Sequence, residues 1–415
     1  MEKCFLAALK LPNIKPLQLH HSIEELRSLA QSAGAITDDV FIQSKNKIDP
    51  AYYFGIGKVT EISDHAQEKN ITTLIIDDEI KPSQQRNLQE LTNLKIVDRT
   101  RLILDIFAKR AQSKEGKLQV ERAQLAYNLT HLACNGVFLD SQKGGIGTRG
   151  PGEKKLETDQ RKIKNQITAL DKELLDIKRH RDTSGKERMN SGTPLIAIVG
   201  YTNAGKSTFL NTIAKSKDPV YADDRLFATL DTATRSVSMS EGRKALFTDT
   251  VGFINKLPHQ LIAAFQSTLS GLSQAHCLLH IIDASNDNYI QQKNTVYEVL
   301  EEVGSADVPV IEVYNKIDSV PAGRLAKIKK ETKECFFISA KSGKGINELL
   351  DGISKLVMPK LQKKIFNIPF GKESVVSQIR SMALIDGQKY SQKGMSITLR
   401  ATPSIITKIS SLLEN

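Results

Sequence analysis

Short apolar runs alternate with helical patterns over the first 111 residues. The runs at residues 5–9, 72–76 and 94–97 are short and continuous, as in buried strands, whereas residues 23–33 and 82–91 carry apolar side chains at helical spacing. Because strand-like and helix-like segments alternate, we expect a small N-terminal α/β domain over residues 1–111.

Two amphipathic stretches follow between residues 112 and 182. Their apolar residues recur in alternating steps of three and four: Leu118, Leu125, Leu129 and Leu132 in the first stretch, and Leu156, Ile163, Ile167, Leu170, Leu174 and Ile177 in the second. This spacing predicts two helices packed antiparallel as an arm. Residues 181–192 are polar and lack apolar periodicity, which predicts a linker into the next domain.

A glycine-rich segment, residues 144–152, separates the two predicted helices. It is too rich in glycine to be helical, and it contains Arg149 and is flanked by Lys143, Lys154 and Lys155. We therefore predict an exposed basic loop at the tip of the arm. Glycines let the backbone approach an RNA surface while basic side chains meet phosphates, so we interpret the loop as an RNA contact. The alternative is a flexible connector with incidental lysines.

The most specific pattern begins after a buried-strand run at residues 195–199. The run leads directly into Gly200-Tyr201-Thr202-Asn203-Ala204-Gly205-Lys206-Ser207-Thr208, which matches the phosphate loop GxxxxGK[ST] in the required strand-to-helix context. In such a loop, backbone N–H groups surround a β-phosphate at the N-terminus of a helix. We expect Lys206 to neutralise phosphate oxygens and the Ser207 hydroxyl to bind Mg²⁺.

Three further elements follow in the order of a GTPase. Asp249-Thr250-Val251-Gly252 is a DxxG element, whose aspartate supports Mg²⁺ and whose glycine N–H can contact the γ-phosphate. Asn315-Lys316-Ile317-Asp318 is an NKxD element, and Ser339-Ala340-Lys341 resembles the SAK element whose backbone N–H meets guanine O6. The Asp318 carboxylate can accept from guanine N1–H and the 2-amino group, which adenine lacks. The set predicts GTP or GDP binding in a domain over residues 193–359 with a doubly wound sheet.

Two positions bear on the hydrolysis step. We place switch I in Leu226-Phe227-Ala228-Thr229-Leu230-Asp231-Thr232, where one threonine hydroxyl should bind Mg²⁺ in the GTP state, with Thr234 as a further candidate. Phe253 follows the DxxG glycine, where many GTPases carry the glutamine that orients the attacking water. A phenyl ring cannot orient water, so we expect slow intrinsic hydrolysis that a partner accelerates; the alternative is another residue that substitutes fully.

The chain length, the net charge and the length of the apolar runs bear on the number of domains, the partners and the location of the protein. A chain of 415 residues needs at least two folding units, and residues 360–415 read as a small C-terminal α+β domain with a strand at 396–399 and a helix at 405–413. The formal net charge of +11 predicts attraction to polyanions, through their phosphates, or to an anionic membrane surface; the alternative is simply a soluble basic protein. No apolar run approaches the roughly 18 residues of a membrane span, and the apolar core of residues 1–11 is too short for a signal peptide, so we expect a cytosolic protein. We also expect it to be a monomer.

The sequence resembles the HflX family of GTPases over nearly its whole length. Outside the phosphate loop and NKxD element, the resemblance rests on residues 77–79, 82–88, 97–100, 115–121, 144–153, 156–159, 227–231 and 249–253. It implies Thr229 as the switch I ligand of Mg²⁺, so that Lys206, Thr229 and Gly252 are the candidate catalytic residues. Thr232 stands where proline is frequent in the family, and Lys154-Lys155 where polar or mixed residues are common. Asn203 resembles the asparagine with which potassium-activated GTPases hold K⁺.

The resemblance implies a GTPase that binds the RNA and protein of the large ribosomal subunit and splits stalled or idle ribosomes. A second hypothesis is an assembly or dormancy factor that binds the same subunit without splitting ribosomes, since both activities need the same GTPase domain and basic arm. A third is an ATP-driven RNA remodeller that uses the N-terminal domain, which predicts ATP turnover that persists in Asp318→Asn.

Overall fold

The computed structural model describes residues 2–135, 151–190, 193–214, 226–227, 233–239, 243–258, 261, 271–358, 361–369, 373–391 and 394–414. The chain divides into two compact units, Met1–Asp351 and Gly352–Asn415. Among the described residues, the helices include none with the length and apolar character needed to cross a bilayer.

The first sheet is built from strands of the N-terminal region in the order β2-β1-β3-β4, and all three pairings are parallel. Its elements are β1 (Glu2–Lys10), α1 (Pro16–Ala33), β2 (Ala35–Ser44), α2 (Ile56–Lys69), β3 (Thr73–Ile76), α3 (Pro82–Thr92), β4 (Lys95–Asp98) and α4 (Arg99–Arg110). The predicted strands and helices are confirmed, and β2 is an additional edge strand. Because all strands are parallel, their carboxyl ends meet at one edge, beside Asp77, Asp78 and Asp98.

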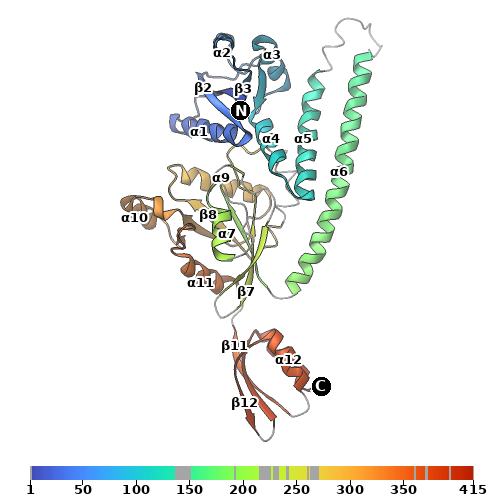
Figure 1. The fold of residues 1–415 in the computed structure, drawn as a ribbon, viewed down its shortest axis with the longest axis vertical. Helices are drawn as coiled ribbons and strands as arrows, with labels where there is room; N and C mark the ends of the chain where they lie inside the picture. The colour runs from blue at the N-terminus through green and yellow to red at the C-terminus, as the bar shows by residue number, and fades with distance from the viewer. Residues whose placement is uncertain are drawn as a thin grey trace. The chain divides into compact units, whose positions relative to one another are not determined.

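Two long helices form the arm. α5 (Lys114–Asn135) and α6 (Pro151–Asn190) lie side by side and run in opposite directions, as predicted (Figure 1). Arg122 on α5 pairs with Asp171 on α6, with the guanidinium Nε 3.0 Å from the carboxylate. At 40 residues, α6 is ~60 Å long at 1.5 Å per residue.

The bounds of α6 correct two predictions. Residues 181–190 are helical and not a linker, because arginine, lysine, glutamate and methionine are good helix formers, and extending an existing helix needs no new nucleation. The helix also starts within the glycine-rich segment, since Pro151 and Gly152 form its first turn, where the missing proline N–H costs no hydrogen bond. The remainder of that segment, residues 144–150, lies outside the described residues, and so does its predicted conformation as an exposed loop.

The second sheet has the order β10-β9-β8-β5-β7-β6 and is parallel except for the β6–β7 pair. Its elements are β5 (Leu195–Gly200), α7 (Lys206–Ala214), β6 (Ala233–Ser238), β7 (Lys244–Asp249), β8 (Cys277–Asp283), α9 (Tyr289–Glu302), β9 (Val310–Asn315), η3 (Ile317–Ser319), α10 (Ala322–Glu331), β10 (Phe336–Phe337) and α11 (Ile346–Val357). The predicted doubly wound α/β class is confirmed (Figure 1). β5 is buried, and its carboxyl end leads directly into the phosphate loop.

The second unit contains a small antiparallel sheet of order β11-β13-β12 with two helices. Its elements are β11 (Gln362–Ile368), α12 (Glu373–Met382), β12 (Leu384–Ser391), β13 (Gly394–Ala401) and α13 (Pro403–Glu414). Ile379 and Ile409 from the helices and Ile397 and Leu399 from β13 are fully buried together, so the predicted α+β appendage has its own core.

Candidate functional site: the phosphate loop and its surroundings

The phosphate loop is held by close backbone contacts with neighbouring strands. Gly200 has φ 151°, and a Cβ there would lie 2.3 Å from the carbonyl oxygen of Ile281 on β8. Gly205 has φ 93°, and a Cβ there would lie 2.3 Å from Nδ2 of Asn315 on β9. Only glycine fits either position, so the two glycines let the loop pass close to β8 and β9 before α7 begins at Lys206.

Lys206 lies inside the loop and is 6% exposed. Its ammonium donates to the carbonyl oxygens of Gly200 (3.1 Å) and Tyr201 (2.8 Å). Burial lowers the pKa of Lys206 to about 8, and the nearby carboxylate of Asp249 opposes this shift. A buried ammonium satisfied only by carbonyls is poised to exchange them for anionic phosphate oxygens.

A hydroxyl and a carboxylate meet where Mg²⁺ is expected. The Ser207 hydroxyl donates to Oδ2 of Asp249, which is fully buried at the end of β7, over 2.7 Å. Thr250 anchors the next position, since its hydroxyl donates to the carbonyl of Ile198 over 2.7 Å. Hard oxygen ligands of this kind suit Mg²⁺, which usually takes few protein ligands together with phosphate oxygens and water.

Asn315 joins the phosphate loop to the SAK segment. Its Nδ2 donates to the carbonyl of Ala204 (2.8 Å), and its Oδ1 accepts from the backbone N–H of Ala340 (2.9 Å). Ala340 also accepts from the Thr212 hydroxyl of α7 over 2.8 Å. One side chain therefore fixes the phosphate loop against the strand end expected to bind the base.

The remaining NKxD residues line the same edge. The Lys316 ammonium lies 2.8 Å from Oδ2 of Asp283 at the end of β8, and Ile317 donates its N–H to Ile338 over 3.3 Å. The Asp318 carboxylate is exposed, and a hydrogen bond from the buried Ser339 hydroxyl holds its pKa below the usual value. Asp318 is therefore ionised and available to accept from a base.

The other predicted residues divide into three groups. Ala204 lies in the phosphate loop, Thr208 in α7, and Val251 directly after β7. The side chains of Asn203 and Lys341 are exposed. Phe227 is 2% exposed and packs edge-on against Phe107 of α4, with ring centroids 4.5 Å apart, so its side chain belongs to the core. Ala228, Thr229, Leu230, Asp231 and Thr232 lie outside the described residues.

The side chain of Phe253 is buried in the protein core and is not exposed to solvent. It is 1% exposed within the apolar cluster, and its backbone pairs with the phosphate loop: Thr202 N–H donates to its carbonyl (2.8 Å), and its N–H donates to Gly200 (3.2 Å). A Cβ on Gly252 would lie 3.0 Å from the Lys206 ammonium. The segment after β7 is thus packed directly onto the phosphate loop.

Comparison with known proteins extends this description. Three family models match the chain: "GTP-binding GTPase N-terminal" over residues 20–108, "GTP-binding GTPase Middle Region" over 110–188, and "50S ribosome-binding GTPase" over 195–316. GTPase HflX of Lacrimispora saccharolytica is 47% identical over 80% of this chain and 77% of the relative. The HflX GTPases of Caldanaerobacter subterraneus (41% identical, 92% and 88% covered) and Escherichia coli (36%, 92% and 90%) are also similar.

The chain belongs to the HflX family of GTPases. It accordingly binds GTP and GDP and hydrolyses GTP, as the order of the four sequence elements predicts. Among solved structures, the GDP complex of SsGBP is 26% identical over 86% of this chain and 98% of that one, with a TM-score of 0.47.

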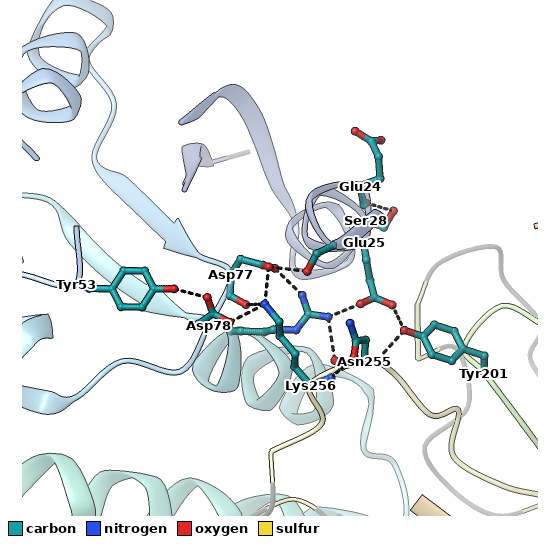
Figure 2. Close-up of polar contacts among 11 residues, drawn as sticks. Glu24, Glu25, Ser28, Tyr53, Asp77, Asp78, Tyr201, Asn255 and Lys256 are labelled. Atoms are coloured by element: carbon teal, nitrogen blue, oxygen red, sulfur yellow. Dashed lines mark hydrogen bonds and ion pairs between the residues drawn. The ribbon is translucent and has the colours of Figure 1, made fainter. Parts of the chain in front are cut away.

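Sequence reasoning assigned no role to a buried polar network that joins the N-terminal sheet of this HflX-family chain to its phosphate loop (Figure 2). Glu25 of α1 accepts from the Tyr201 hydroxyl and from Arg99, which is 1% exposed. Arg99 also donates to Asp77 (2.8 Å) and to the carbonyl of Asn255 (3.0 Å). One signal for this network was present in the sequence: Asp77 and Arg99 directly follow strands that were predicted to be buried. Charged residues need partners when they are buried.

Proposed function

We propose that this GTPase binds the large ribosomal subunit and dissociates stalled or idle ribosomes, with hydrolysis stimulated by the ribosome. The observation that carries the proposal is the match of residues 195–316 to a family described as 50S ribosome-binding GTPases. The net charge of +11 favours binding to ribosomal RNA, and the long α5–α6 arm offers a rigid basic element to insert between subunits.

We propose a division of labour among the site residues, in which the role of Thr229 rests on the family resemblance and the other roles are supported by the geometry of the site. Lys206 and the loop N–H groups would hold the phosphates, Ser207 and Thr229 would bind Mg²⁺ with support from Asp249, and Gly252 would contact the γ-phosphate. Bound Mg²⁺ supplies charge neutralisation at the β- and γ-phosphates. Asn315 and Asp318, with the Ser339–Lys341 backbone, would recognise guanine. Asn203 is the candidate ligand for K⁺.

Partner stimulation follows from Phe253. Its phenyl ring is buried in the apolar cluster, and a hydrocarbon ring cannot hold the attacking water, so we infer that ribosomal contacts supply or order the group that does. GTP hydrolysis should therefore rise strongly when large subunits are added. Measuring it in potassium and in sodium, with ATP as control, also tests the K⁺ site.

The decisive experiment counts free subunits after the protein and GTP are added to intact ribosomes. Native protein should release subunits, and Lys206→Ala should not, because the buried ammonium that neutralises the phosphates is absent. Undiminished splitting by Lys206→Ala would refute the model. Subunit-stimulated hydrolysis without any release of subunits would instead support an assembly or dormancy factor.

A further inference from the structure

Lys256 connects the segment after the DxxG element to the N-terminal sheet. Its ammonium lies 2.8 Å from Oδ2 of Asp77, 2.6 Å from Oδ1 of Asp78 and 3.2 Å from the carbonyl oxygen of Asp77 (Figure 2). An ammonium has three donors, and here each finds an acceptor. Both aspartates follow β3 at the carboxyl edge of a parallel sheet, where open α/β sheets bind ligands. The ligand-binding edge of the N-terminal sheet therefore binds a lysine of the GTPase domain.

The carboxylates of this site are oriented by other groups as well. Asp77 is 1% exposed and accepts from Ser22 (2.6 Å) at Oδ2 and from Arg99 (2.8 Å) at Oδ1. Asp78 accepts from the Tyr53 hydroxyl at Oδ2. Lys256 meets them with φ 53°, a backbone conformation uncommon for lysine. The site is thus preformed on the N-terminal side, and the segment after Gly252 bends to reach it.

The other end of this segment occupies space next to the phosphate site. A Cβ on Gly252 would lie 2.8 Å from Cγ2 of Thr202 and 3.0 Å from the Lys206 ammonium, and Phe253 is hydrogen-bonded to the loop through its N–H and its carbonyl. In a GTP complex, the γ-phosphate contacts both the lysine and the glycine N–H. The position of Gly252 relative to Lys206 therefore bears on the binding of GTP, whereas GDP has no γ-phosphate to place between them.

We propose that Lys256, through its carboxylate site on the N-terminal sheet, sets the preference of the nucleotide site for GDP over GTP. In this proposal the ion pair favours the present arrangement of residues 252–256, which packs Gly252 against Thr202 and the Lys206 ammonium, over the arrangement that receives a γ-phosphate. Because the two equilibria are coupled, GTP binding must also weaken the hold of the N-terminal sheet on Lys256. The proposal concerns nucleotide discrimination alone and does not depend on any ribosomal role.

The test uses Lys256→Met, which keeps the aliphatic stem and removes the ammonium. The full chain is titrated with fluorescent GDP and with a fluorescent, non-hydrolysable GTP analogue, without ribosomes. Affinity for the GTP analogue should rise about tenfold, equivalent to about 1.4 kcal/mol, while affinity for GDP changes less than about twofold. The gain is limited because Arg99 still holds the Asn255 carbonyl and because the Lys256 side chain is 34% exposed.

A matched control is Lys69→Met. Lys69 also pairs with two carboxylates in the N-terminal domain, Asp38 (2.8 Å) and Asp39, and both partners lie within that domain. Its loss should leave the ratio of GTP to GDP affinities unchanged.

Asp78→Asn tests the same contact from the other side and should change the affinity ratio in the same direction as Lys256→Met but by less, because Asp77 still holds the ammonium; the double variant should show no further gain over Lys256→Met. It also serves if Lys256→Met fails to fold. An unchanged ratio in either folded variant would overturn the proposal. Equal weakening of both nucleotides would overturn it too, because Lys256 would then only stabilise the site as a whole.

Discussion

Removal of the Asn315 side chain tests the geometry of the nucleotide site most directly. In Asn315→Ala, the Ala204 carbonyl loses its 2.8 Å donor and the Ala340 N–H loses its 2.9 Å acceptor. Both backbone groups belong to residues that are at most 2% exposed, so water cannot readily replace the amide. The phosphate loop and the SAK segment then lose their shared anchor.

The magnitude follows from the two orphaned groups. A buried polar group without a partner costs about 1–3 kcal/mol, so two such groups together cost roughly 2–6 kcal/mol. If the empty site relaxes and relieves about 3 kcal/mol of this cost, GDP binding has to restore the strained arrangement, so that amount appears as weaker binding. That corresponds to a loss of GDP affinity of roughly 100-fold.

The assay is an equilibrium titration with fluorescent GDP, compared with Asn286→Ala. Asn286 is a suitable control because, in the described part of the chain, its carboxamide accepts from Asn288 N–H over 2.7 Å within a local turn. Asn286→Ala should bind GDP within about threefold of the native protein. If Asn315→Ala also stayed within threefold while remaining folded, the bridge would not organise the site and the reasoning would be refuted.

Three further outcomes are expected. Gly205→Ala should weaken GDP binding at least about tenfold in the same titration, because φ 93° and the 2.3 Å approach to Asn315 leave no place for a methyl group; native affinity would contradict this. Burial lowers the pKa of Lys206 to about 8 from 10.5, so GDP binding should take up protons between about pH 8 and 10.5, as measured by calorimetry in buffers of different ionisation enthalpy; no uptake at pH 9 would contradict this. Phe253→Gln should lower the melting temperature by a few degrees and leave unstimulated GTP hydrolysis within about threefold, since the side chain is 1% exposed and cannot reach an attacking water; faster hydrolysis would disprove this.

The phosphate-binding elements were predictable because each is local in sequence. The loop, the DxxG element and the NKxD element each span at most nine residues, and each follows a strand whose apolar run is visible in the sequence. β2 was missed because it lies at the sheet edge, where alternating exposed positions, including Asp38, break the apolar run. Residues 181–190 were misjudged because a polar segment can extend an existing helix without apolar periodicity and without a new nucleation step.

The links between the N-terminal sheet and the nucleotide site were not predictable in the same way. Glu25 lies 74 residues from Arg99 and 176 from Tyr201, and Asp77 lies 179 residues from Lys256. The sequence shows that Asp77 and Arg99 border buried strands and so need partners, because a buried unpaired charge is too costly to persist. It does not show which partners, since a lysine from any exposed loop satisfies the same requirement. The chemistry of GTP binding is therefore encoded in short motifs, whereas its coupling to the rest of the chain is encoded in single charged residues whose pairing only the fold reveals.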